Sequence, residues 1–594
     1  MSLQFIFGNS GSGKSHYLYQ QIVEESIRHP EKNYLVLVPE QFTMQTQKDL
    51  CMAHPRGGIM NIDILSFGRL AHRVFEETGK ERQPILDDEG KNLVLRKIAG
   101  NYEDELTVLK GNLKKQGYIS EVKSVISEFT QYGIDFEQLD SFMEGLNPES
   151  YLYYKLKDIR KVYEGFEDYL RDKYITKEEL LDVLSQTVPE AKMLKNSVIA
   201  MDGFTGFTPV QNRLIGELLK VCDKIMLTVE IDRREDPFVY KHPYQLFALS
   251  KQMVTSLTEV AQEVRVEIDE PVWLCKNPSY RFKENPEMAF LEEELFRYSR
   301  RKYSGEKMRS ISLHEVHTPQ EEAQYVAEEI RRLVREEGYR YREIAVIASD
   351  LSTYADALEK ACDRYEIPVF KLTRLLNSFV EYLRSLLVMV EQNYTYESVF
   401  RYLRTRLCGF TRDEVDRLEN YCLALDLKGF KKWDQVWVRK TPMTTKEELE
   451  ELNHLRMRFV EKLTPLHTVL KKRKKTVKEI TLAVYEYLVQ EKIQEQLAEL
   501  EQKFQEDGEL ALAKEYAQIY RIVLELFDKF VELLGEEEIP LKEYCELLDA
   551  GLEEAKVGVI PPSLDQVVIG DMERTRLKDI RALFFVGVNE GCIP

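Results

Sequence analysis

The chain has 594 residues, with 83 Lys and Arg against 102 Asp and Glu, which gives a formal net charge of −19. At roughly 150 residues per domain, this length predicts about four domains. The acidic balance excludes a uniformly basic nucleic-acid-binding surface, although it leaves room for a local basic groove. With 43% hydrophobic and 31% charged residues, the composition is typical of an ordered, helix-rich protein.

Eight cysteines are scattered along the chain, and none forms a Cys-x-x-Cys pair or a short Cys/His cluster. This spacing favours reduced, buried thiols over disulfides or a metal site. No apolar run reaches about 18 residues, and the first residues lead into a strand pattern without the layout of a signal peptide. The sequence therefore predicts a cytoplasmic protein with no membrane partner.

The first part of the chain alternates between strand and helix patterns. Residues 15–27 have apolar side chains at helical spacing, and charged amphipathic helices fill residues 76–194. Short apolar runs predict strands at 3–7, 34–38, 62–65, 197–201 and 224–229. We therefore expect a parallel α/β sheet that is interrupted by a helical insertion.

A second α/β pattern begins near residue 310. Residues 321–334 have helical spacing, and helices dominate from about 375 to 560. Strand patterns lie at 311–316, 343–348, 566–570 and 582–588. The layout of sheet, helical insertion and sheet thus occurs twice along the chain.

Residues 8–15 read GlyAsnSerGlySerGlyLysSer, a full match to the phosphate-loop pattern G-x-x-x-x-G-K-[ST]. The glycines let the loop turn its backbone N–H groups toward phosphate oxygens, while the lysine neutralises phosphate charge and the last hydroxyl can bind Mg²⁺. A strand before the loop and a helix after it supply the expected context. The predicted ATP-binding residues are Gly8, Gly11, Ser12, Gly13, Lys14 and Ser15.

Hydrolysis of a bound nucleotide also needs an acidic residue at the end of a neighbouring strand. Asp202 follows the strand pattern 197–201 and is the predicted second contact to Mg²⁺, together with Ser15. Helicase-type ATPases carry a catalytic glutamate at the next position, which is Gly203 here. A missing general base typically costs about 10²–10⁴-fold in rate, so we predict ATP·Mg²⁺ binding with weak or no turnover and assign no catalytic residue.

With these motifs in place, the whole chain resembles superfamily-one helicases of the UvrD type and, more closely, the B-subunit family of AddAB ATP-dependent helicase–nucleases. The resemblance rests on an ordered set of segments rather than on the phosphate loop alone. These segments are 8–15, 37–43, 64–74, 202–209, 321–327, 570–577 and 587–594.

The resemblance implies an α/β fold of two RecA-like parallel-sheet lobes, each interrupted by a helical insertion, in the P-loop NTPase architecture of UvrD-like helicases. The first lobe would comprise 1–75 and 195–300, with 76–194 as its insertion. The second lobe would comprise 301–375 and 561–594, with 376–560 as its insertion.

Departures from the helicase pattern indicate a motor that has decayed. The helicase motif D-E-x-Q-D is replaced by AspGlyPheThrGly, so that Gly203 and Thr205 stand where the catalytic glutamate and the nucleotide-sensing glutamine would be. Ser349 and Asp350 follow the strand at 343–348, where a motor helicase would have an arginine near the γ-phosphate. No adenine-contacting glutamine motif precedes the first strand.

In the resembled family, the decayed motor reads single-stranded DNA for the recombination hotspot Chi, while an A-type subunit drives translocation during double-strand break processing. The resemblance thus implies a heterodimer with an A-type helicase–nuclease subunit and contact with single-stranded DNA and duplex ends. Polar and aromatic side chains at strand ends suit base recognition. The implied DNA-reading residues are Gln41, Thr43, Phe67, Arg69, His72, Phe204 and Phe207.

The family also carries a carboxy-terminal nuclease domain with an iron–sulfur cluster, and this chain has no matching cysteine motif. We therefore expect the chain to be about half of a longer deoxyribonuclease subunit. Two other readings remain open: an active ATP-driven helicase in which another acid replaces the missing glutamate, and a structural scaffold with a vestigial nucleotide site.

Two basic segments offer further DNA contacts. Residues 471–475 read LysLysArgLysLys, a run that is usually a solvated helix face. Residues 428–440 interleave basic residues with Trp433 and Trp437, a mixture that suits base stacking. For this second segment, we favour tryptophans that pack between helices.

Overall fold

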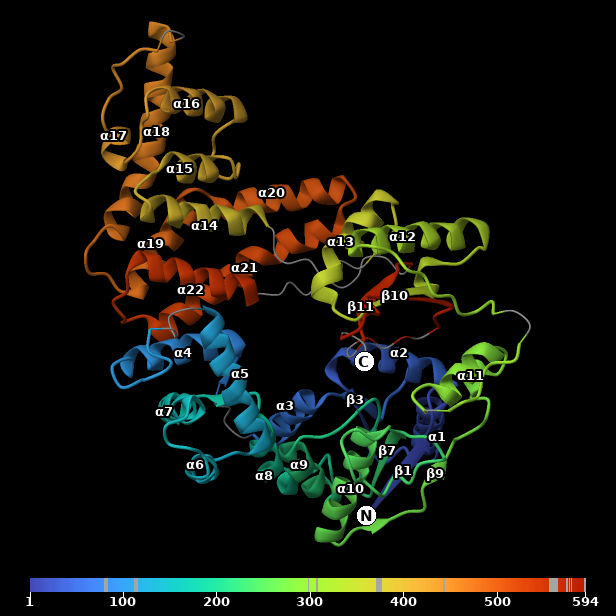
Figure 1. The fold of residues 1–594 in the computed structure, drawn as a ribbon. Coiled ribbons are helices and arrows are strands. Elements are labelled where there is room, and N and C mark those ends of the chain that lie inside the picture. The colour runs from blue at the N-terminus through green and yellow to red at the C-terminus, as the bar shows by residue number, and fades with distance from the viewer. Residues whose placement is uncertain are drawn as a thin grey trace. The chain divides into compact units, whose positions relative to one another are not determined.

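The computed structural model describes residues 1–79, 84–111, 116–171, 173–297, 299–305, 308–369, 377–441, 444–554, 565–572, 575, 577 and 579–591. The chain divides into two compact units (Figure 1). One unit contains Met1–Asp87, Tyr102–Asn112 and Ser120–Glu315, and the other contains Asp88–Asn101, Leu113–Ile119 and Val316–Pro594. Each unit has a parallel sheet of its own.

The first unit is built on a seven-stranded parallel sheet in the order β3-β2-β6-β7-β1-β8, with β9 also paired to β1. The strands are β1 (Ser2–Gly8), β2 (Tyr34–Leu37), β3 (Ile62–Leu65), β6 (Val198–Met201), β7 (Lys224–Glu230), β8 (Glu267–Ile268) and β9 (Val272–Trp273). The central strands β2 and β6 are apolar throughout, as strands buried on both faces must be.

Helices cover both faces of this sheet. Leu3, Phe5 and Phe7 of β1 point into one core with α3 (Phe67–Thr78), α8 (Glu179–Thr187), α9 (Pro209–Leu219) and α10 (Ala248–Glu263). Ile6 points into the opposite core with α1 (Lys14–Arg28) and α2 (Thr43–Ala53). This alternation along β1 is the period of two that a strand imposes. The other helices here are α5 (Gln116–Tyr132), α6 (Phe136–Glu144), α7 (Tyr151–Leu170) and α11 (Pro286–Glu294).

The carboxyl ends of all these strands lie at one edge of the sheet, because the strands are parallel. The segments that leave β1, β2, β3 and β6 therefore meet at this edge. These are the phosphate loop and the three segments that carry the predicted DNA-reading residues.

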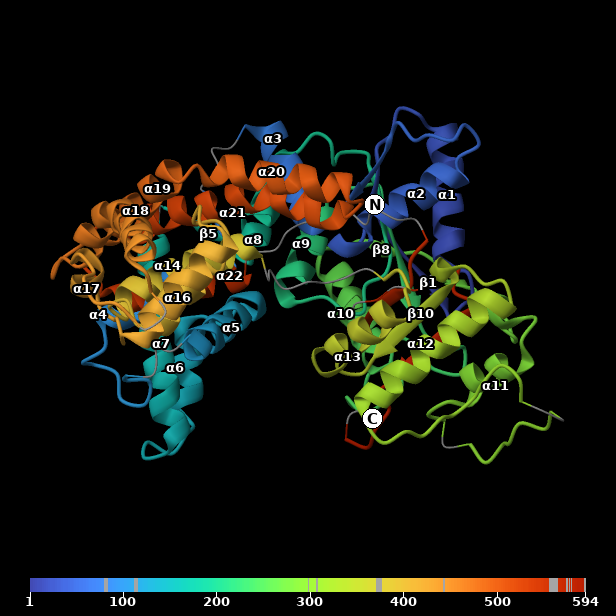
Figure 2. The same cartoon turned by 90° about the horizontal axis from the view of Figure 1, so that it is seen from above.

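The second unit contains a three-stranded parallel sheet in the order β11-β10-β12. Its strands are β10 (Ile344–Ala348), β11 (Val568–Asp571) and β12 (Ala582–Val586). Helices α12 (Pro319–Glu336) and α13 (Leu351–Arg364) pack with β10 in one core, and Figure 2 shows both helices beside that strand.

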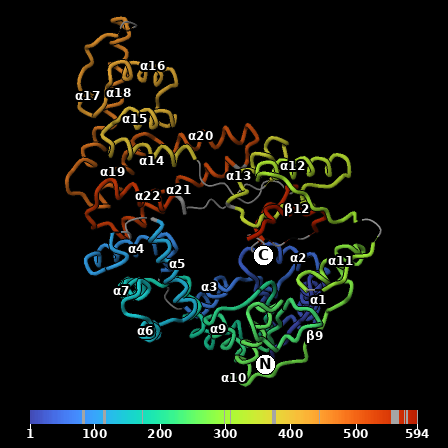
Figure 3. Tube along the Cα trace, in the orientation of Figure 1, coloured from blue at the N-terminus to red at the C-terminus, as the bar shows by residue number. Residues whose placement is uncertain are grey.

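The remaining helices of the second unit follow one another between α13 and β11 (Figure 3). They are α14 (Ser378–Glu391), α15 (Tyr396–Leu403), α16 (Arg412–Ala424), α17 (Phe430–Asp434), α18 (Lys446–Leu470), α19 (Val477–Gln490), α20 (Ile493–Glu506), α21 (Leu510–Leu534) and α22 (Leu541–Glu554). Helix α4 (Asp88–Asn101) packs against α21 and α22, where Lys97 donates to the Leu533 carbonyl and Arg96 pairs with Glu546.

Most of the predicted strands are present, and the α/β fold with two parallel sheets is confirmed. Residues 311–316 are an exception, since they form no strand. The Glu287 carboxylate accepts the N–H groups of Arg309 and Ser310, just before this segment, and the Leu313 side chain is 94% exposed. Within residues 76–194, a short parallel pair of β4 (Ile85–Leu86) and β5 (Ile175–Thr176) was not foreseen.

The two basic segments belong to the second unit. Trp433 and Trp437 are buried, and their rings pack against each other and against Phe459 and Tyr421, which confirms the preferred interpretation. Residues 472–475 lie in the connection from α18 to α19 rather than on a helix. None of the helices in the described part of the chain is both long enough and apolar enough to span a membrane.

Candidate functional site

The phosphate loop joins the buried strand β1 to helix α1 at the carboxyl edge of the first sheet. Gly11 and Gly13 have φ values of 71° and 92°, a region that residues other than glycine seldom adopt. Lys14 and Ser15 are the first residues of α1, whose N-terminal N–H groups favour anions. The predicted ATP-binding residues are therefore brought together in one loop.

Two glycines of the loop allow neighbouring side chains to approach so closely that a methyl group would clash with them. A Cβ atom at Gly8 would lie 2.4 Å from the Ser12 Oγ, and one at Gly11 would lie 2.6 Å from the Cβ of Arg281. Arg281 approaches closely because its backbone N–H donates to the Gly11 carbonyl at 3.0 Å. The segment around Arg281 thus lies directly against the loop, although no pattern in the sequence predicts this contact.

Lys14 is held inside the loop by its own backbone. Its Nζ donates to the carbonyl oxygens of Gly8 at 3.0 Å and Asn9 at 2.9 Å. Burial lowers the pKa of Lys14, while the nearby carboxylates of Glu230 and Asp202 act in the opposite direction. An anionic ligand would offset the cost of burying this ammonium group.

Three buried polar atoms around the loop have no hydrogen-bond partner among the described residues. They are Asn9 Oδ1, Ser12 Oγ and Ser279 Oγ. Ser279 is 1% exposed, and its Oγ is 3.3 Å from the position that a Cβ of Gly11 would take. Because buried polar groups are normally paired, this loop has hydrogen-bonding capacity available for a ligand.

Asp202 is the polar centre beside the loop. Its Oδ1 accepts hydrogen bonds from Ser15 Oγ at 2.9 Å and Thr228 Oγ1 at 2.7 Å, and its Oδ2 accepts one from the Tyr19 hydroxyl at 2.7 Å. Asp202 is only 2% exposed, so these three hydroxyls compensate for burying its charge. The pairing of Ser15 with Asp202 brings together the two predicted Mg²⁺ contacts.

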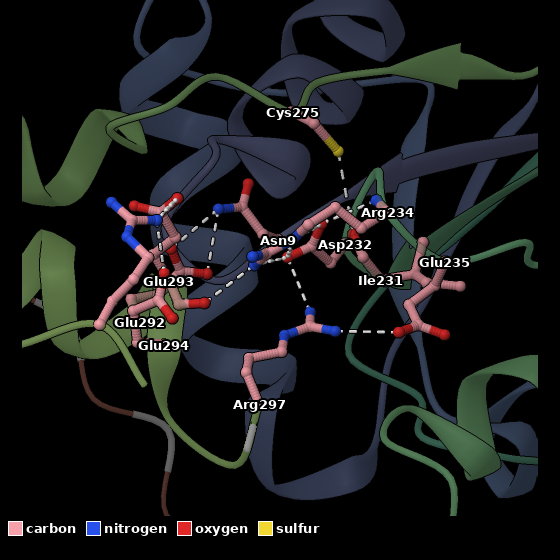
Figure 4. A network of polar contacts seen from close by, with 11 residues as sticks. Asn9, Ile231, Asp232, Arg234, Glu235, Cys275, Glu292, Glu293, Glu294 and Arg297 are labelled. Atoms are coloured by element: carbon pink, nitrogen blue, oxygen red, sulfur yellow. Dashed lines mark hydrogen bonds and ion pairs between the residues drawn. The ribbon is translucent and has the colours of Figure 1, made fainter. Parts of the chain in front are cut away.

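A network of charged side chains flanks the other side of the loop (Figure 4). The Asn9 amide donates to both oxygens of Glu292, at 3.0 and 3.1 Å. Burial raises the pKa of Glu292, although the hydrogen bond from Asn9 partly opposes this. Arg297 pairs with Asp232 at 2.7 Å and with Glu235 at 2.9 Å, which fixes the chain that follows β7.

The three predicted DNA-reading phenylalanines form one aromatic cluster. The Phe67 ring lies 5.5 Å from that of Phe204 and 6.3 Å from that of Phe207, between ring centroids, and the latter two are 5.1 Å apart. Phe67 is 8% exposed and belongs to the core, whereas Phe204 and Phe207 are half-buried against it. The cluster joins the ends of β3 and β6.

The polar residues that are predicted to read DNA differ in exposure. Gln41, Arg69 and His72 are exposed, whereas Thr43 is buried at the start of α2, where its Oγ1 donates to the Glu40 carbonyl at 3.0 Å. Arg69 and His72 are three residues apart on α3, so they share one helix face. Their position at the ends of β2 and β3 agrees with the expected edge of the sheet.

The corresponding edge of the second sheet is arranged differently. Glu322 accepts the Gly587 N–H at 3.0 Å and the Tyr354 hydroxyl at 2.7 Å, and Ser349 Oγ donates to the Gly587 carbonyl at 2.7 Å. Of the motif segments assigned to this unit, Glu573, Arg574 and Arg576 lie outside the described residues, and so does Cys592.

Sequence patterns did not reveal several residues that surround the phosphate loop and Asp202. Thr228 left a signal, because it is a polar residue within the apolar strand β7. No sequence signal pointed to Tyr19, Arg281 or Glu292, because their contacts depend on how distant segments pack.

The described part of the chain contains no group of His, Cys, Asp and Glu side chains that could hold a metal ion by themselves. Its seven cysteines form no disulfides.

Two family models match the chain and together span most of it. Residues 5–292 match the model described as "ADDB, N-terminal". Residues 282–558 match the model of the UvrD-like helicase C-terminal domain. The first match contains the phosphate loop, Asp202 and every predicted DNA-reading residue.

Curated relatives that are named as the B subunit of an ATP-dependent helicase/deoxyribonuclease align with the whole chain. Identity is 42% to the protein of Lachnoclostridium phytofermentans, 33% to that of Clostridium novyi and 32% to that of Acetivibrio thermocellus. In each case the alignment covers 100% of this chain and 52% of the relative, so the chain spans about half their length. These matches assign residues 5–292 to an AddB amino-terminal domain and residues 282–558 to a UvrD-like helicase C-terminal domain, with the α/β architecture of UvrD-like helicases.

Proposed function

We propose that this chain is the nucleotide-binding and DNA-reading part of the B subunit of an ATP-dependent helicase–nuclease that processes double-strand breaks for recombination. In this role it binds ATP·Mg²⁺ and single-stranded DNA but turns ATP over poorly. The observation that carries the proposal is the phosphate loop next to Asp202, with Gly203 in place of a catalytic glutamate.

The loop fits the triphosphate of a nucleotide. The partnerless Ser12 hydroxyl and the buried Lys14 ammonium suit phosphate oxygens, and the exposed Arg281 beside Gly11 adds a second cation. Ser15 and Asp202 are the residues that would hold Mg²⁺, which when bound neutralises phosphate charge. Arg281 would thus supply a positive charge near the phosphates from the first unit. Ser349 and Asp350, which stand where a motor helicase has an arginine, supply no such charge.

Poor turnover follows from what stands beside Asp202. Gly203 and Thr205 are exposed at this edge and carry no carboxylate that could orient an attacking water. Glu230 lies at the end of β7, and its carboxylate raises the pKa of Lys14 by stabilising the charged ammonium group. Binding without efficient hydrolysis is therefore the expected behaviour.

The DNA-reading role is supported by the exposed polar residues at the ends of β2 and β3. Gln41 and Arg69 can each make bidentate contacts with base edges, and His72 lies on the same helix face as Arg69. Phe204 and Phe207 are half-exposed aromatic rings for base stacking. Phe67 and Thr43 are buried, so their role would be to support these exposed neighbours. The DNA sequence that we propose these residues read is the Chi hotspot of the resembled family.

Further partners follow from family membership and are part of the proposal. The chain would pair with an A-type helicase–nuclease subunit that supplies ATP-driven translocation. The iron–sulfur cluster and the nuclease of the family would lie outside these 594 residues.

The proposal is tested by measuring ATP binding and ATPase activity of the 594-residue chain, with and without single-stranded DNA. We expect ATP binding that Lys14→Ala weakens about tenfold to a hundredfold, the value of a hydrogen bond to a charged group. Lys283→Ala, which removes an exposed lysine two residues beyond Arg281, is the control. ATPase turnover should stay below about 1 s⁻¹, the low end of ordinary enzyme rates.

Other outcomes favour the alternatives. DNA-stimulated turnover above that rate that is lost in Lys14→Ala would indicate an active helicase. No ATP binding and no affinity for single-stranded DNA would indicate a structural scaffold.

A further inference from the structure

Asp202 lies between the phosphate loop and the helix that follows β2. Its Oδ1 accepts a hydrogen bond from Ser15 of the loop, and its Oδ2 accepts one from Tyr19, one turn further along α1. The Tyr19 hydroxyl is also 3.3 Å from the Thr46 Oγ1 on α2. Hydrogen bonds thus run from the phosphate loop through Asp202 and Tyr19 to α2.

The far end of this connection reaches the DNA-reading edge. Helix α2 begins at Thr43, and Gln41 lies in the preceding turn, η1 (Glu40–Phe42). The Asp202 backbone N–H also donates to the Leu37 carbonyl at 3.1 Å, at the end of β2. The segment that carries Gln41 and Thr43 is therefore tied to Asp202 at both its start and its end.

The three members of the connection beyond Ser15 are buried. Tyr19 is 6% exposed, Thr46 1% and Asp202 2%. Tyr19 and Leu50 of α2 pack in the same apolar core. A close-packed core transmits a displacement rather than absorbing it, so a change in the bonds of Asp202 has a short, rigid route to α2.

We propose that Tyr19 is a positioning residue that couples nucleotide binding to single-stranded DNA binding. The inference rests on the proposed function, and it adds a specific link between the two sites. Ser15 donates its hydroxyl proton to Asp202 and keeps its oxygen lone pairs for a phosphate-bound Mg²⁺. A bound Mg²⁺ would draw Ser15 and Asp202 toward the nucleotide, and the bonds of Asp202 to Tyr19 and Thr228 would then adjust.

Coupling of this kind is reciprocal, because each ligand must change the affinity for the other by the same factor. Typical couplings change affinity about fivefold to 150-fold. Removal of the Tyr19 hydroxyl should bring that factor close to one, while the aromatic ring keeps its place in the core.

The test measures the dissociation constant of a fluorescein-labelled single-stranded oligonucleotide, with and without a saturating non-hydrolysable ATP analogue and Mg²⁺. In the unmodified chain we expect the nucleotide to change this constant about fivefold or more. In Tyr19→Phe the change should fall below about twofold, with each ligand titrated to saturation of the variant so that a weaker affinity for one ligand alone does not imitate a loss of coupling. Thr46→Val, which removes the other hydroxyl of the same contact, should act in the same direction.

Tyr17→Phe is the matched control. Tyr17 lies on the same helix and packs against the same core, but its hydroxyl has no hydrogen-bond partner among the described residues. This variant should keep the full coupling factor. Thermal melts followed by circular dichroism verify that all three variants are folded.

The outcomes separate the two proposals. If both ligands bind but neither affects the other in the unmodified chain, the coupling is refuted and the proposed function stands. Unchanged coupling in Tyr19→Phe refutes the role of Tyr19. If the unmodified chain binds no nucleotide or no DNA, the proposed function fails, and the coupling fails with it.

Discussion

The carboxyl edges of the two parallel sheets have similar topology but differ in whether their polar groups are already hydrogen-bonded within the protein. At the edge of the first sheet, Asn9, Ser12 and Ser279 keep buried polar atoms without a partner in the described structure. At the edge of the second sheet, Glu322 accepts both the Gly587 N–H and the Tyr354 hydroxyl. The first edge has hydrogen bonds to offer a ligand, whereas these groups of the second are already paired within the protein.

Charge sharpens this difference. The first edge presents Lys14 and Arg281 around glycines that let the Ser12 and Arg281 side chains approach the loop backbone closely. The strand β10 of the second sheet runs instead into Ser349 and Asp350. A parallel sheet provides a crevice at this edge, but only suitable side chains turn the crevice into an anion site.

The largest expected effect is a loss of ATP affinity when a methyl group is added to the phosphate loop at the first edge. Gly11→Ala would place its Cβ 2.6 Å from the Cβ of Arg281, which forces the loop or the Arg281 segment to move. Because displacements near 1 Å can cost about a hundredfold at a functional site, we expect at least that loss of ATP affinity by equilibrium binding.

Gly57→Ala separates this effect from backbone strain. Gly57 has a φ of 67°, close to the 71° of Gly11, but a Cβ there would meet nothing within 4 Å. Its ATP affinity should be unchanged. An equal loss of ATP affinity in Gly57→Ala would mean that alanine at a positive φ lowers ATP affinity without any contact to the phosphate loop.

At the second edge we expect an effect on stability alone. Glu322→Gln weakens a charged acceptor that serves two donors, and hydrogen bonds to charged groups are worth about 1.5–3 kcal/mol. Urea unfolding followed by circular dichroism should show a loss of this order, and Tyr354→Phe should show a smaller one. A loss of ATP affinity in Glu322→Gln would contradict the contrast between the two edges.

A smaller effect is expected at the proposed DNA-reading residues of the first edge. Arg69→Ala should cost about 1–3 kcal/mol in binding to the preferred members of a panel of single-stranded oligonucleotides. Arg73→Ala on the same helix removes an exposed pair with Asp63, at 3.1 Å, and should leave that preference intact. An equal loss for every oligonucleotide in Arg69→Ala would indicate phosphate contact instead of base reading.

The sequence was sufficient for features that depend on consecutive residues. The phosphate loop is one such feature, because strand, glycines, lysine and helix follow one another directly. Asp202 could be placed as well, since it ends an apolar strand. Tyr19 could not, because its contact with Asp202 depends on β6 lying beside β2 in the sheet, and strand order is not encoded in any local pattern.

Two further differences between expectation and structure have physical causes. The strand predicted at 311–316 is absent, and the Glu287 carboxylate binds the backbone N–H groups just before it. Phe67 was expected to meet bases, but its ring packs against Phe204 and Phe207. An aromatic residue at a strand end can be a ligand platform or a core residue, and only packing decides.

The smallest effect concerns a carboxylate of the first unit that lies away from the sheet edge. Burial, followed by the nearby charge of Glu179, raises the pKa of Glu167 on α7 to about 7 from its ordinary value of 4.5. The folded chain then holds this proton more tightly than the unfolded chain, so the unfavourable charge is present above pH 7 and disappears as the pH falls from 7 to 4.5.

Glu167→Gln should therefore raise the melting temperature by about 1–3 °C at pH 8.5 and leave it unchanged at pH 5, as measured by scanning calorimetry. Glu164→Gln, an exposed neighbour on the same helix that pairs with Arg160, should give the same small change at both pH values. Neither variant should alter ATP affinity, because Glu167 and Glu164 lie on α7 and have no recorded contact with the phosphate loop in the described part of the chain. If the change in melting temperature caused by Glu167→Gln were the same at both pH values, the pKa of Glu167 would not be raised by folding.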